Sequence, residues 1–234
     1  MSQEHQTPPI PPERVSVIIP TKNEAGNIGG VIERALPFGE VLVVDGESTD
    51  GTAEEASRHP VRLIIEKRPG KGSAIRRGIA EARGEALVFL DGDGSHDPCD
   101  IPRLLAPIAA GEADMVIASR AKGGSDEADG SPDSRLRSIG SALLARMVNF
   151  RWGTRLTDPI NGFRAARAEP LKSLVLRCDD FRIELETLIG FVTAGLRVAE
   201  VPSREYRRVS GKSKFPTRNG HIYLTYFLKR AILG

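Results

Sequence analysis

Two aspartates separated by a single glycine are the residues of this chain best suited to metal chemistry. Asp91 and Asp93 follow Ala86 to Leu90, a short apolar run typical of a buried strand. Two carboxylates on one loop can both turn toward a hard cation, and oxygen ligands of this kind suit Mg²⁺ or Mn²⁺. Such an ion would keep open positions for phosphate oxygens and neutralise a diphosphate leaving group. Asp-Gly is also a common turn dipeptide, so a purely structural role is the alternative for this pair taken alone.

Other polar groups come directly after apolar stretches in the same half of the chain. Thr21 and Glu24 follow one apolar run, and Asp45 ends another. In open α/β sheets, ligands bind beyond the carboxyl ends of the strands, so these groups would meet at one edge. The turn Gly70-Lys71-Gly72 could cradle a phosphate, but neither GxxxxGK followed by Ser or Thr nor GxGxxG is present. A tight turn before a helix is the alternative there.

The elements that must position these groups are short apolar runs that alternate with helical spacing. The runs predict five strands, at residues 15–19, 41–44, 61–65, 86–90 and 115–118. Apolar positions three and four residues apart predict helices between them. Strands that are apolar on both faces and separated by helices indicate a mainly parallel central sheet flanked by helices, so the first half is expected to form a doubly wound α/β unit.

The second half is organised differently. Residues 121–134 are polar and Gly-rich, which predicts a mobile loop. We expect a helix, a turn-rich segment, a second helix, a strand and a C-terminal amphipathic helix, at about 135–150, 158–163, 184–194, 197–201 and 216–234. Both halves are expected to share one sheet, which gives a single catalytic domain at 14–215 with halves at 14–120 and 121–215. The polar, Pro-rich residues 1–13 predict a disordered leader.

Composition excludes several classes of protein. The 234 residues include 33 Lys and Arg against 31 Asp and Glu, a net charge of +2, so no nucleic-acid partner is expected. Two cysteines without a CxxC pair exclude a disulfide scaffold and a Cys-rich zinc module, and fit a reducing, cytoplasmic compartment. No apolar run approaches the ~20 residues that span a bilayer. The apolar side chains of 222–232, with Lys229 and Arg230, favour either peripheral contact with the cytoplasmic membrane face or packing on the sheet.

Several segments, taken together and in order, resemble glycosyltransferase family 2 with the GT-A fold. They are Pro20-Thr-Lys-Asn-Glu24, Val43-Val-Asp-Gly-Glu-Ser-Thr-Asp-Gly-Thr52, Gly70-Lys-Gly72 and Leu90-Asp-Gly-Asp-Gly-Ser-His-Asp-Pro98. The second half resembles the dolichyl- or polyprenyl-phosphate mannosyltransferase branch, through Asp158-Pro-Ile-Asn-Gly-Phe-Arg164, Ile183-Glu184 and the stretch from Glu200 to Lys214. The resemblance covers about residues 14–215.

The resemblance implies a Rossmann-like nucleotide-diphospho-sugar transferase that works with inversion and a divalent metal. By position, the residues that would line the nucleotide-sugar pocket are Pro20, Thr21, Glu24, Asp45, Lys71, Asp91, Gly92 and Asp93. Asp91 and Asp93 would hold Mg²⁺ or Mn²⁺ and, through it, the diphosphate. Ser95 falls where some relatives place a third ligand on the metal side. Asp45-Gly46-Glu47 stands where Asp-Asp-Gly is common, which leaves the contacts to the nucleobase open.

The resemblance also implies an acceptor site rich in arginine. The matching residues are Arg120, Arg137, Ser141 and Arg208, with Lys214 nearby. A phosphate acceptor is already anionic and needs positive charge rather than a general base. A hydroxyl acceptor would need a base, for which Asp158 and Glu184 are the candidates. In the polyprenyl-phosphate branch these two acids would instead orient arginines or the donor sugar.

The sequence thus favours transfer of a hexose, mannose from GDP-mannose first, to a polyprenyl or dolichyl phosphate. Two other functions stay open. One keeps the fold but uses a UDP- or GDP-sugar with a soluble phosphate or hydroxyl acceptor. The other is a non-catalytic nucleotide-sugar binding subunit that serves a membrane partner, against which the intact Asp91-Gly-Asp93 counts.

Overall fold

The computed structural model of the chain is described for residues 9–127, 131–208, 210 and 221–233. A seven-stranded sheet forms its centre, in the order β3-β2-β1-β4-β6-β5-β7. The strands are β1 (Val15–Thr21), β2 (Glu40–Asp45), β3 (Arg62–Ile65), β4 (Ala86–Phe89), β5 (Met115–Ser119), β6 (Arg164–Arg167) and β7 (Val198–Pro202). Of these named strands only β6 runs antiparallel to its neighbours. The predicted mainly parallel α/β sheet, shared by both halves of the chain, is confirmed.

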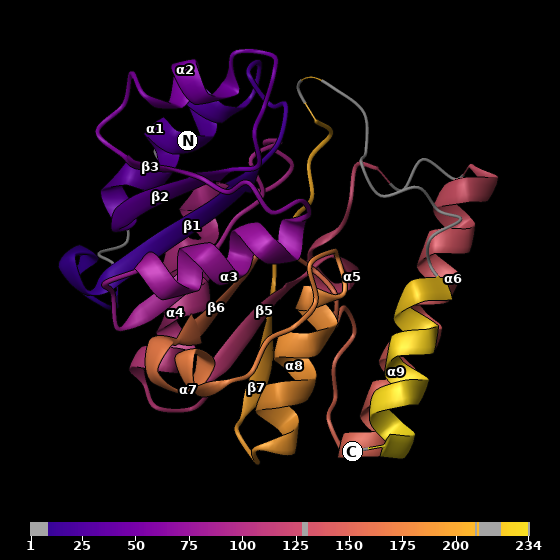
Figure 1. Ribbon diagram of the computed structural model, residues 1–234. Helices are drawn as coiled ribbons and strands as arrows, with labels where there is room; N and C mark the ends of the chain where they lie inside the picture. Colours follow the sequence, from indigo (N-terminus) through magenta and orange to yellow (C-terminus); the bar gives the residue numbers. More distant parts are fainter. Residues whose placement is uncertain (1–8, 128–130, 209, 211–220, 234) are drawn as a thin grey trace, which may run out of the picture.

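Helices join and cover the strands (Figure 1). They are α1 (Ile28–Ala35), α2 (Thr52–Ala56), α3 (Lys71–Glu81), α4 (Ile101–Ala109), α5 (Arg120–Gly123), α6 (Pro132–Trp152), α7 (Ala168–Ser173), α8 (Ile183–Thr193) and α9 (His221–Leu233). Three short 3₁₀ turns add to them, η1 (Pro12–Arg14), η2 (Leu36–Phe38) and η3 (Pro98–Asp100).

The core has two layers because successive strand residues point to opposite faces of the sheet. Ile18 packs on one face with apolar residues of α3, α7 and α8. Its neighbours Val17 and Ile19 pack on the other face with α1 and α4. All seven residues of β1 are buried, as expected for a central strand that helices cover on both sides.

The chain order creates a crevice beside β1. The chain runs outward from β1 to β2 and β3, and then returns to place β4 on the other side of β1. The carboxyl ends of β1 and β2 lie level, since Thr21 pairs in register with Asp45. Reversal of strand order of this kind is where open α/β sheets bind their ligands.

The structure departs from the expected elements at β6 and at the loop 121–134. Strand β6 was not predicted, because Arg-Ala-Ala-Arg lacks the apolar run of the other strands; its small Ala165 and Ala166 are buried between β4 and β5. The expected loop at 121–134 is shorter, because α5 ends at Gly123 and α6 begins at Pro132. Residues 128–130 of that loop, and most of the expected leader, lie outside the described residues, although η1 forms at the end of the leader.

Helices α6 and α9 lie side by side along one flank of the molecule (Figure 1). The rings of Trp152 and Phe227 meet edge to face, with centroids 5.6 Å apart. Leu144 and Val148 of α6 and Tyr223 of α9 are buried with the core layer that includes α3 and α8. Each of the two helices therefore packs one apolar face inward.

Candidate active site

A cavity of about 300 Å³ opens at the crevice between β1 and β4. Its lining includes seven of the eight residues predicted for the nucleotide-sugar pocket, namely Pro20, Thr21, Glu24, Lys71, Asp91, Gly92 and Asp93. The parallel strands bring these residues together because their carboxyl ends share one edge of the sheet. We call this space the donor cavity.

Asp45 is the predicted residue that does not line the donor cavity. Its buried carboxylate accepts hydrogen bonds from the backbone N–H and the hydroxyl of Ser48, and so closes the loop after β2. The next residue, Gly46, does line the cavity. The structure thus places Asp45 behind the wall of the cavity rather than on its surface.

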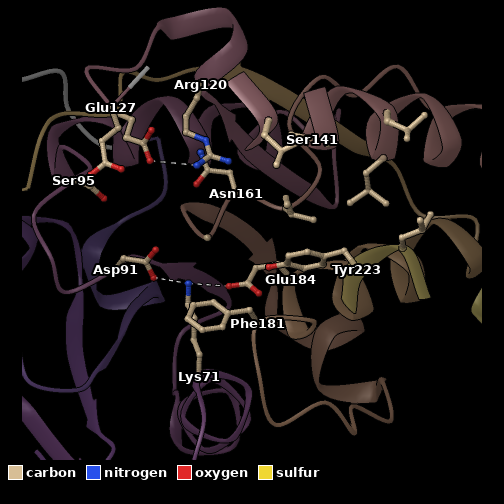
Figure 2. A pocket seen from close by; sticks show the side chains of 18 of the residues that line it. Lys71, Asp91, Ser95, Arg120, Glu127, Ser141, Asn161, Phe181, Glu184 and Tyr223 are labelled. Atoms are coloured by element: carbon tan, nitrogen blue, oxygen red, sulfur yellow. Dashed lines mark hydrogen bonds and ion pairs between the residues drawn. The ribbon is translucent and has the colours of Figure 1, made fainter. Parts of the chain in front are cut away.

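Lys71 at the first turn of α3 lies between two carboxylates from distant parts of the chain (Figure 2). Its Nζ lies 2.6 Å from Oδ1 of Asp91 and 2.8 Å from Oε1 of Glu184. Burial opposes the charge on Lys71, but the two carboxylates outweigh it and raise the pKa of Lys71. Burial likewise opposes the charge on Asp91, and Lys71 outweighs it, so the pKa of Asp91 is lowered.

Two glycines make this bridge possible. Gly70 adopts φ of +103°, and a Cβ there would lie 2.0 Å from the carbonyl oxygen of Asp179. A Cβ on Gly162 would lie 2.8 Å from Nζ of Lys71 and 2.9 Å from Oδ2 of Asp91. A larger residue at position 162 would displace the lysine and the aspartate, and one at position 70 would displace the backbone at Asp179, against which α3 begins.

Asp93 is buried and pairs with Arg208, whose Nη2 lies 3.0 Å from its Oδ2. Ser95 donates its backbone N–H to Oδ1 of Asp93, but Ser95 does not line the donor cavity. Asp91 and Asp93 both border the donor cavity, and their hard oxygen atoms fit a divalent cation. No cluster of three His, Cys, Asp or Glu suited to a metal occurs in the part of the chain that the structure describes.

A second cavity, of about 540 Å³, adjoins the first. Lys71, Asp91, Phe181 and Arg208 line both cavities, so the two spaces meet at these residues. The polar side chains at the inner end include Arg120, Glu127 and Glu184. The rest of the lining is largely apolar and includes Leu136, Leu143, Leu144, Met147, Ile160 and Leu224. We call this space the acceptor cavity.

Arg120, a predicted phosphate ligand, is held by two acids at the wall of the acceptor cavity. Its Nε and Nη2 donate to the two oxygens of Asp158 at 2.7 and 2.9 Å, and its Nη1 donates to Glu205 at 3.2 Å. Burial opposes both charges, but the pairing outweighs it, raising the pKa of Arg120 and lowering that of Asp158. Asp158 lines neither cavity, so its geometry fits the orientation of Arg120 that the sequence suggested.

The turn that carries Asp158 is held by Glu200 and Arg164, to which the sequence alone assigned no role. Glu200 of β7 accepts from the backbone N–H groups of Thr157 and Asp158, each at 2.7 Å. The buried guanidinium of Arg164 donates to the carbonyl oxygens of Asn161 and Glu184, and so joins the turn to the start of α8. The position of Arg164 at the end of the Asp158–Arg164 motif is the one sign in the sequence of such a role.

Of the remaining predicted acceptor residues Ser141, Arg137 and Lys214, the structure describes the side chain of Ser141 alone. Ser141 lines the acceptor cavity, on the side of α6 (Figure 2). The side chain of Arg137 and the whole of Lys214 lie outside the described residues. Three further lining residues, Glu127, Phe181 and Tyr223, were not foreseen, because each comes from a segment without a recognisable motif.

The sequence matches the family described as "Glycosyl transferase family 2" over residues 16–175. Glycosyltransferase AglJ of Haloferax volcanii is 33% identical over 227 residues, which cover 94% of this chain and 73% of that protein. The undecaprenyl-phosphate mannosyltransferase of Micrococcus luteus is 32% identical over 216 residues, which cover 86% of this chain and 87% of that protein. The dolichol-phosphate mannosyltransferase of Pyrococcus furiosus is 34% identical over 92% of this chain, a match that spans 63% of its own length.

Solved structures share the fold. Glucosyl-3-phosphoglycerate synthase from Mycobacterium tuberculosis, in complex with Mn²⁺ and UDP-glucose, matches with a TM-score of 0.72 and 26% identity over 92% of this chain and 79% of that one. The same enzyme with Mn²⁺, UDP-glucose and phosphoglyceric acid gives a TM-score of 0.75 and 27% identity over 94% of this chain and 80% of that one. The predicted GT-A fold is therefore confirmed. No helix among the described residues is long and apolar enough to cross a membrane.

Proposed function

The chain belongs to glycosyl transferase family 2 and is a glycosyltransferase, and on that premise we propose that it transfers a hexose from a nucleoside-diphosphate sugar to a polyprenyl phosphate. The donor we propose is GDP-mannose, in line with the mannosyltransferases among the relatives. The new bond joins a phosphate oxygen of the acceptor to the anomeric carbon. The bond from that carbon to the diphosphate breaks, and the nucleoside diphosphate leaves with the electron pair.

One observation carries this proposal: the acceptor cavity is amphiphilic. Arg120 and Arg208 lie at the end that meets the donor cavity, and leucines of α6 and α9 line the remainder. A polyprenyl phosphate has the same division, with a dianionic head and an apolar tail. Arginine suits the head because its fork can donate two hydrogen bonds to one phosphate.

The donor cavity supplies the other half of the reaction. We propose that Asp91 and Asp93 hold Mg²⁺ or Mn²⁺, which would neutralise the charge that develops on the leaving diphosphate. Lys71 keeps Asp91 ionised and fixes it against Glu184. Pro20, Thr21 and Glu24 would contact the nucleoside at the end of β1.

The ion pairs favour a phosphate acceptor over a hydroxyl. Asp158 is bound on both oxygens by Arg120, and its lowered pKa makes it a poor proton acceptor. Oε1 of Glu184 forms an ion pair with Nζ of Lys71, while Oε2 of Glu184 is buried without a hydrogen-bond partner among the described residues. An orphaned carboxylate oxygen on a residue that lines the acceptor cavity and binds Lys71, which lines both cavities, is suited to accept a hydrogen bond from a sugar hydroxyl. We propose that Glu184 positions the donor sugar.

A second function has specific support. The solved glucosyl-3-phosphoglycerate synthase complexes pair Mn²⁺ and UDP-glucose with a small phosphorylated acceptor. The same cationic end of the acceptor cavity could bind such a phosphate, and the apolar walls would then contribute little. The lining of the cavity favours the lipid, because a small polar acceptor gains nothing from leucine side chains.

The test measures transfer with both donors and both acceptors. Purified protein receives Mn²⁺ and radiolabelled GDP-mannose or UDP-glucose, with either undecaprenyl phosphate in detergent or 3-phosphoglycerate. We expect label from GDP-mannose in the organic phase only when undecaprenyl phosphate is present. A new labelled product in the water phase, separated from the unreacted donor by anion-exchange chromatography and formed only with 3-phosphoglycerate, would replace the lipid acceptor by the soluble one. No transfer with any pair would contradict both substrate assignments.

A further inference from the structure

His96 is a buried histidine in the wall of the acceptor cavity. It comes three residues after Asp93, and its side chain is only 4% exposed. It lines the acceptor cavity together with Arg120 and Glu205, but it does not line the donor cavity. A neutral histidine can both donate and accept a hydrogen bond, so His96 is a candidate ligand for a molecule that enters the acceptor cavity.

The fold holds His96 firmly in this wall. Its backbone forms an antiparallel β-bridge with Glu205, and the backbone N–H of Tyr206 donates to the carbonyl oxygen of Ser95 at 2.7 Å. The imidazole packs on the ring of the fully buried Phe163, with ring centroids 5.2 Å apart. A side chain that is fixed through its backbone and its ring loses little conformational freedom when it binds a ligand.

The hydrogen-bonding capacity of this imidazole is not used within the described part of the chain. Nδ1 of His96 is buried without a hydrogen-bond partner, whereas Nε2 is not enclosed in this way. A polar atom that is held out of water without a partner is costly, and such atoms are rare in folded proteins. Because His96 lines the acceptor cavity, a ligand in that cavity can use the nitrogen that is not enclosed.

The surroundings of His96 favour a neutral ring with its proton on Nε2. Burial lowers the pKa of His96 and outweighs the opposite effect of Asp91 and Glu205. A neutral imidazole carries one N–H and one lone pair. A proton on Nδ1 would have no acceptor among the described residues, whereas a proton on Nε2 can be donated to a ligand. His96 therefore presents a neutral N–H donor to the acceptor cavity.

A neutral donor suits the place beside Arg120. This arginine already donates to both oxygens of Asp158 and to Glu205. A second positive charge at position 96 would repel Arg120, which is one of the causes that lower the pKa of His96. A neutral N–H avoids this repulsion and still forms a charge-assisted hydrogen bond with an anionic phosphate oxygen.

We propose that Nε2–H of His96 donates a hydrogen bond to the phosphate of the acceptor, next to Arg120. The proposal deepens the proposed function and rests on its phosphate acceptor, because it assigns a further ligand to that phosphate. A polyprenyl phosphate and a free phosphate share the chemistry that His96 recognises. The loss of this hydrogen bond should weaken binding of the acceptor and leave binding of the donor unchanged.

Substitutions at position 96 test which ring nitrogen acts. In His96→Gln an amide lies near the place of Nε2, in His96→Asn an amide lies near that of Nδ1, and His96→Phe keeps the ring on Phe163 without a donor. Calorimetric titration with Mg²⁺ present measures the Kd of citronellyl phosphate, a short isoprenoid phosphate, and of inorganic phosphate. We expect both Kd values to rise about tenfold in His96→Phe and His96→Asn, and to stay within about threefold of the wild type in His96→Gln.

The matched control is His59→Phe. Nε2 of His59 is also buried without a hydrogen-bond partner among the described residues, but His59 lines neither cavity. This variant should bind both phosphates as the wild type does, and the thermal midpoint of each variant verifies folding. Equal affinity of the wild type and folded His96→Phe for both phosphates would overturn the proposal. A loss with inorganic phosphate alone would also overturn it, since the isoprenoid phosphate would then bind elsewhere.

Nitrogen-15 chemical shifts of the imidazoles report a contact that a purely structural role would not produce. The chain has four histidines, and the signals missing from His96→Phe identify those of His96. The free protein should show a neutral ring at position 96 with the proton on Nε2. Citronellyl phosphate should shift this Nε2 signal and leave the signals of His59 in place. A proton on Nδ1, or signals of His96 that do not move at saturating ligand, would overturn the proposal.

Transfer assays separate the role of His96 from the proposed function. Phosphate binding that depends on His96, without transfer to undecaprenyl phosphate, would support His96 as a phosphate ligand and contradict the lipid acceptor. Transfer to undecaprenyl phosphate with the same acceptor KM in the wild type and in His96→Phe would overturn the role of His96 and leave the proposed function intact.

Discussion

The donor cavity and the exposed apolar surface of helices α6 and α9, which we name the α6–α9 face, use charged and apolar residues in opposite ways. At the donor cavity, Lys71, Asp91 and Glu184 are drawn together from three elements, and each charge has a partner. The α6–α9 face consists of six exposed apolar side chains: Leu136, Ile139, Leu143, Phe150, Leu224 and Leu228. The first region places charge out of water, and the second places apolar surface in water.

The difference between these regions separates two kinds of stabilisation. A buried ion pair contributes little net stability but becomes costly when one partner is removed. An exposed apolar side chain contributes almost nothing to folding, because it leaves water only when a partner arrives. Substitutions at the donor cavity should therefore change catalysis and stability, whereas substitutions of exposed side chains that line neither cavity, such as Ile139 and Phe150, should leave both nearly unchanged. The following predictions test that contrast, from the largest effect to the smallest.

Asp93→Ala should have the largest effect. It removes one of the two proposed metal ligands, and we expect transfer to fall at least about 10³-fold, equivalent to ~4 kcal/mol of transition-state stabilisation. Turnover is measured at saturating Mn²⁺, and the thermal midpoint verifies folding. The control is Asp97→Ala, an aspartate that pairs with Arg34 and lines neither cavity. Near-normal turnover of the Asp93 variant would remove Asp93 from the metal site.

Lys71→Met should lower stability strongly, because it leaves Asp91 and Glu184 facing each other without the cation between them. We expect the free energy of unfolding to fall by about 3 kcal/mol in the presence of a chelator. Mn²⁺ should restore part of this loss, since it binds the native state and replaces the missing charge. Urea unfolding with chelator or with Mn²⁺ measures both effects.

The control for this prediction is Lys172→Met. The ammonium of Lys172 donates to the carbonyl oxygen of Ala82, far from either cavity. It should lose less stability and gain nothing from Mn²⁺. Equal losses in the two variants, with no effect of the metal, would show that the bridge at Lys71 has no special electrostatic role.

The pair of Arg120 and Asp158 should make stability depend on pH. The pKa of Asp158 is lowered in the folded chain, so the unfolded chain takes up a proton at higher pH than the folded one does. The contribution of Asp158 is therefore complete above the ordinary aspartate pKa of ~3.9 and is lost as the pH falls through the folded value. The slope for one group cannot exceed about 1.4 kcal/mol per pH unit.

Asp158→Asn should remove this part of the pH dependence. Urea unfolding of wild type and variant between pH 6 and pH 3 measures the difference, and the wild type should lose more stability toward the acid end. Parallel curves for the two proteins would mean that the pairing with Arg120 does not favour the ionised form of Asp158.

Phe150→Ser should have the smallest effect on folding. Phe150 is 94% exposed, so the free energy of unfolding should change by less than about 0.5 kcal/mol. Its partner for comparison is Phe227 of α9, which is buried against Trp152, and Phe227→Ala should cost about 3 kcal/mol. Urea unfolding measures both changes. A large loss of stability at Phe150 would mean that this side chain already has a partner.

Much of the fold could be predicted because the decisive signals are local. Unbroken runs of Val, Ile and Leu identified β1, β2, β4 and β5, and the motif Asp91-Gly-Asp93 fell directly after one of them. Seven of the eight residues predicted for the donor cavity do line it. Strand β6 was not predicted, because two alanines between arginines show no apolar periodicity. The segment forms a strand through its hydrogen-bonded pairing with β4 and β5, which come from other parts of the chain.

The amino-acid sequence by itself determined every strand except β6, the mainly parallel sheet and the acidic loop at its edge, since side-chain periodicity and turn chemistry act over a few residues. Only the tertiary structure decided which charges meet. Lys71 binds Glu184, Arg120 binds Asp158 and Arg208 binds Asp93, each across a long stretch of chain. The tertiary structure also decided which apolar stripe of α6 stays exposed. Which charges form ion pairs and which side chains are buried depends on contacts between segments that are distant in the sequence. No local pattern of residues encodes those contacts.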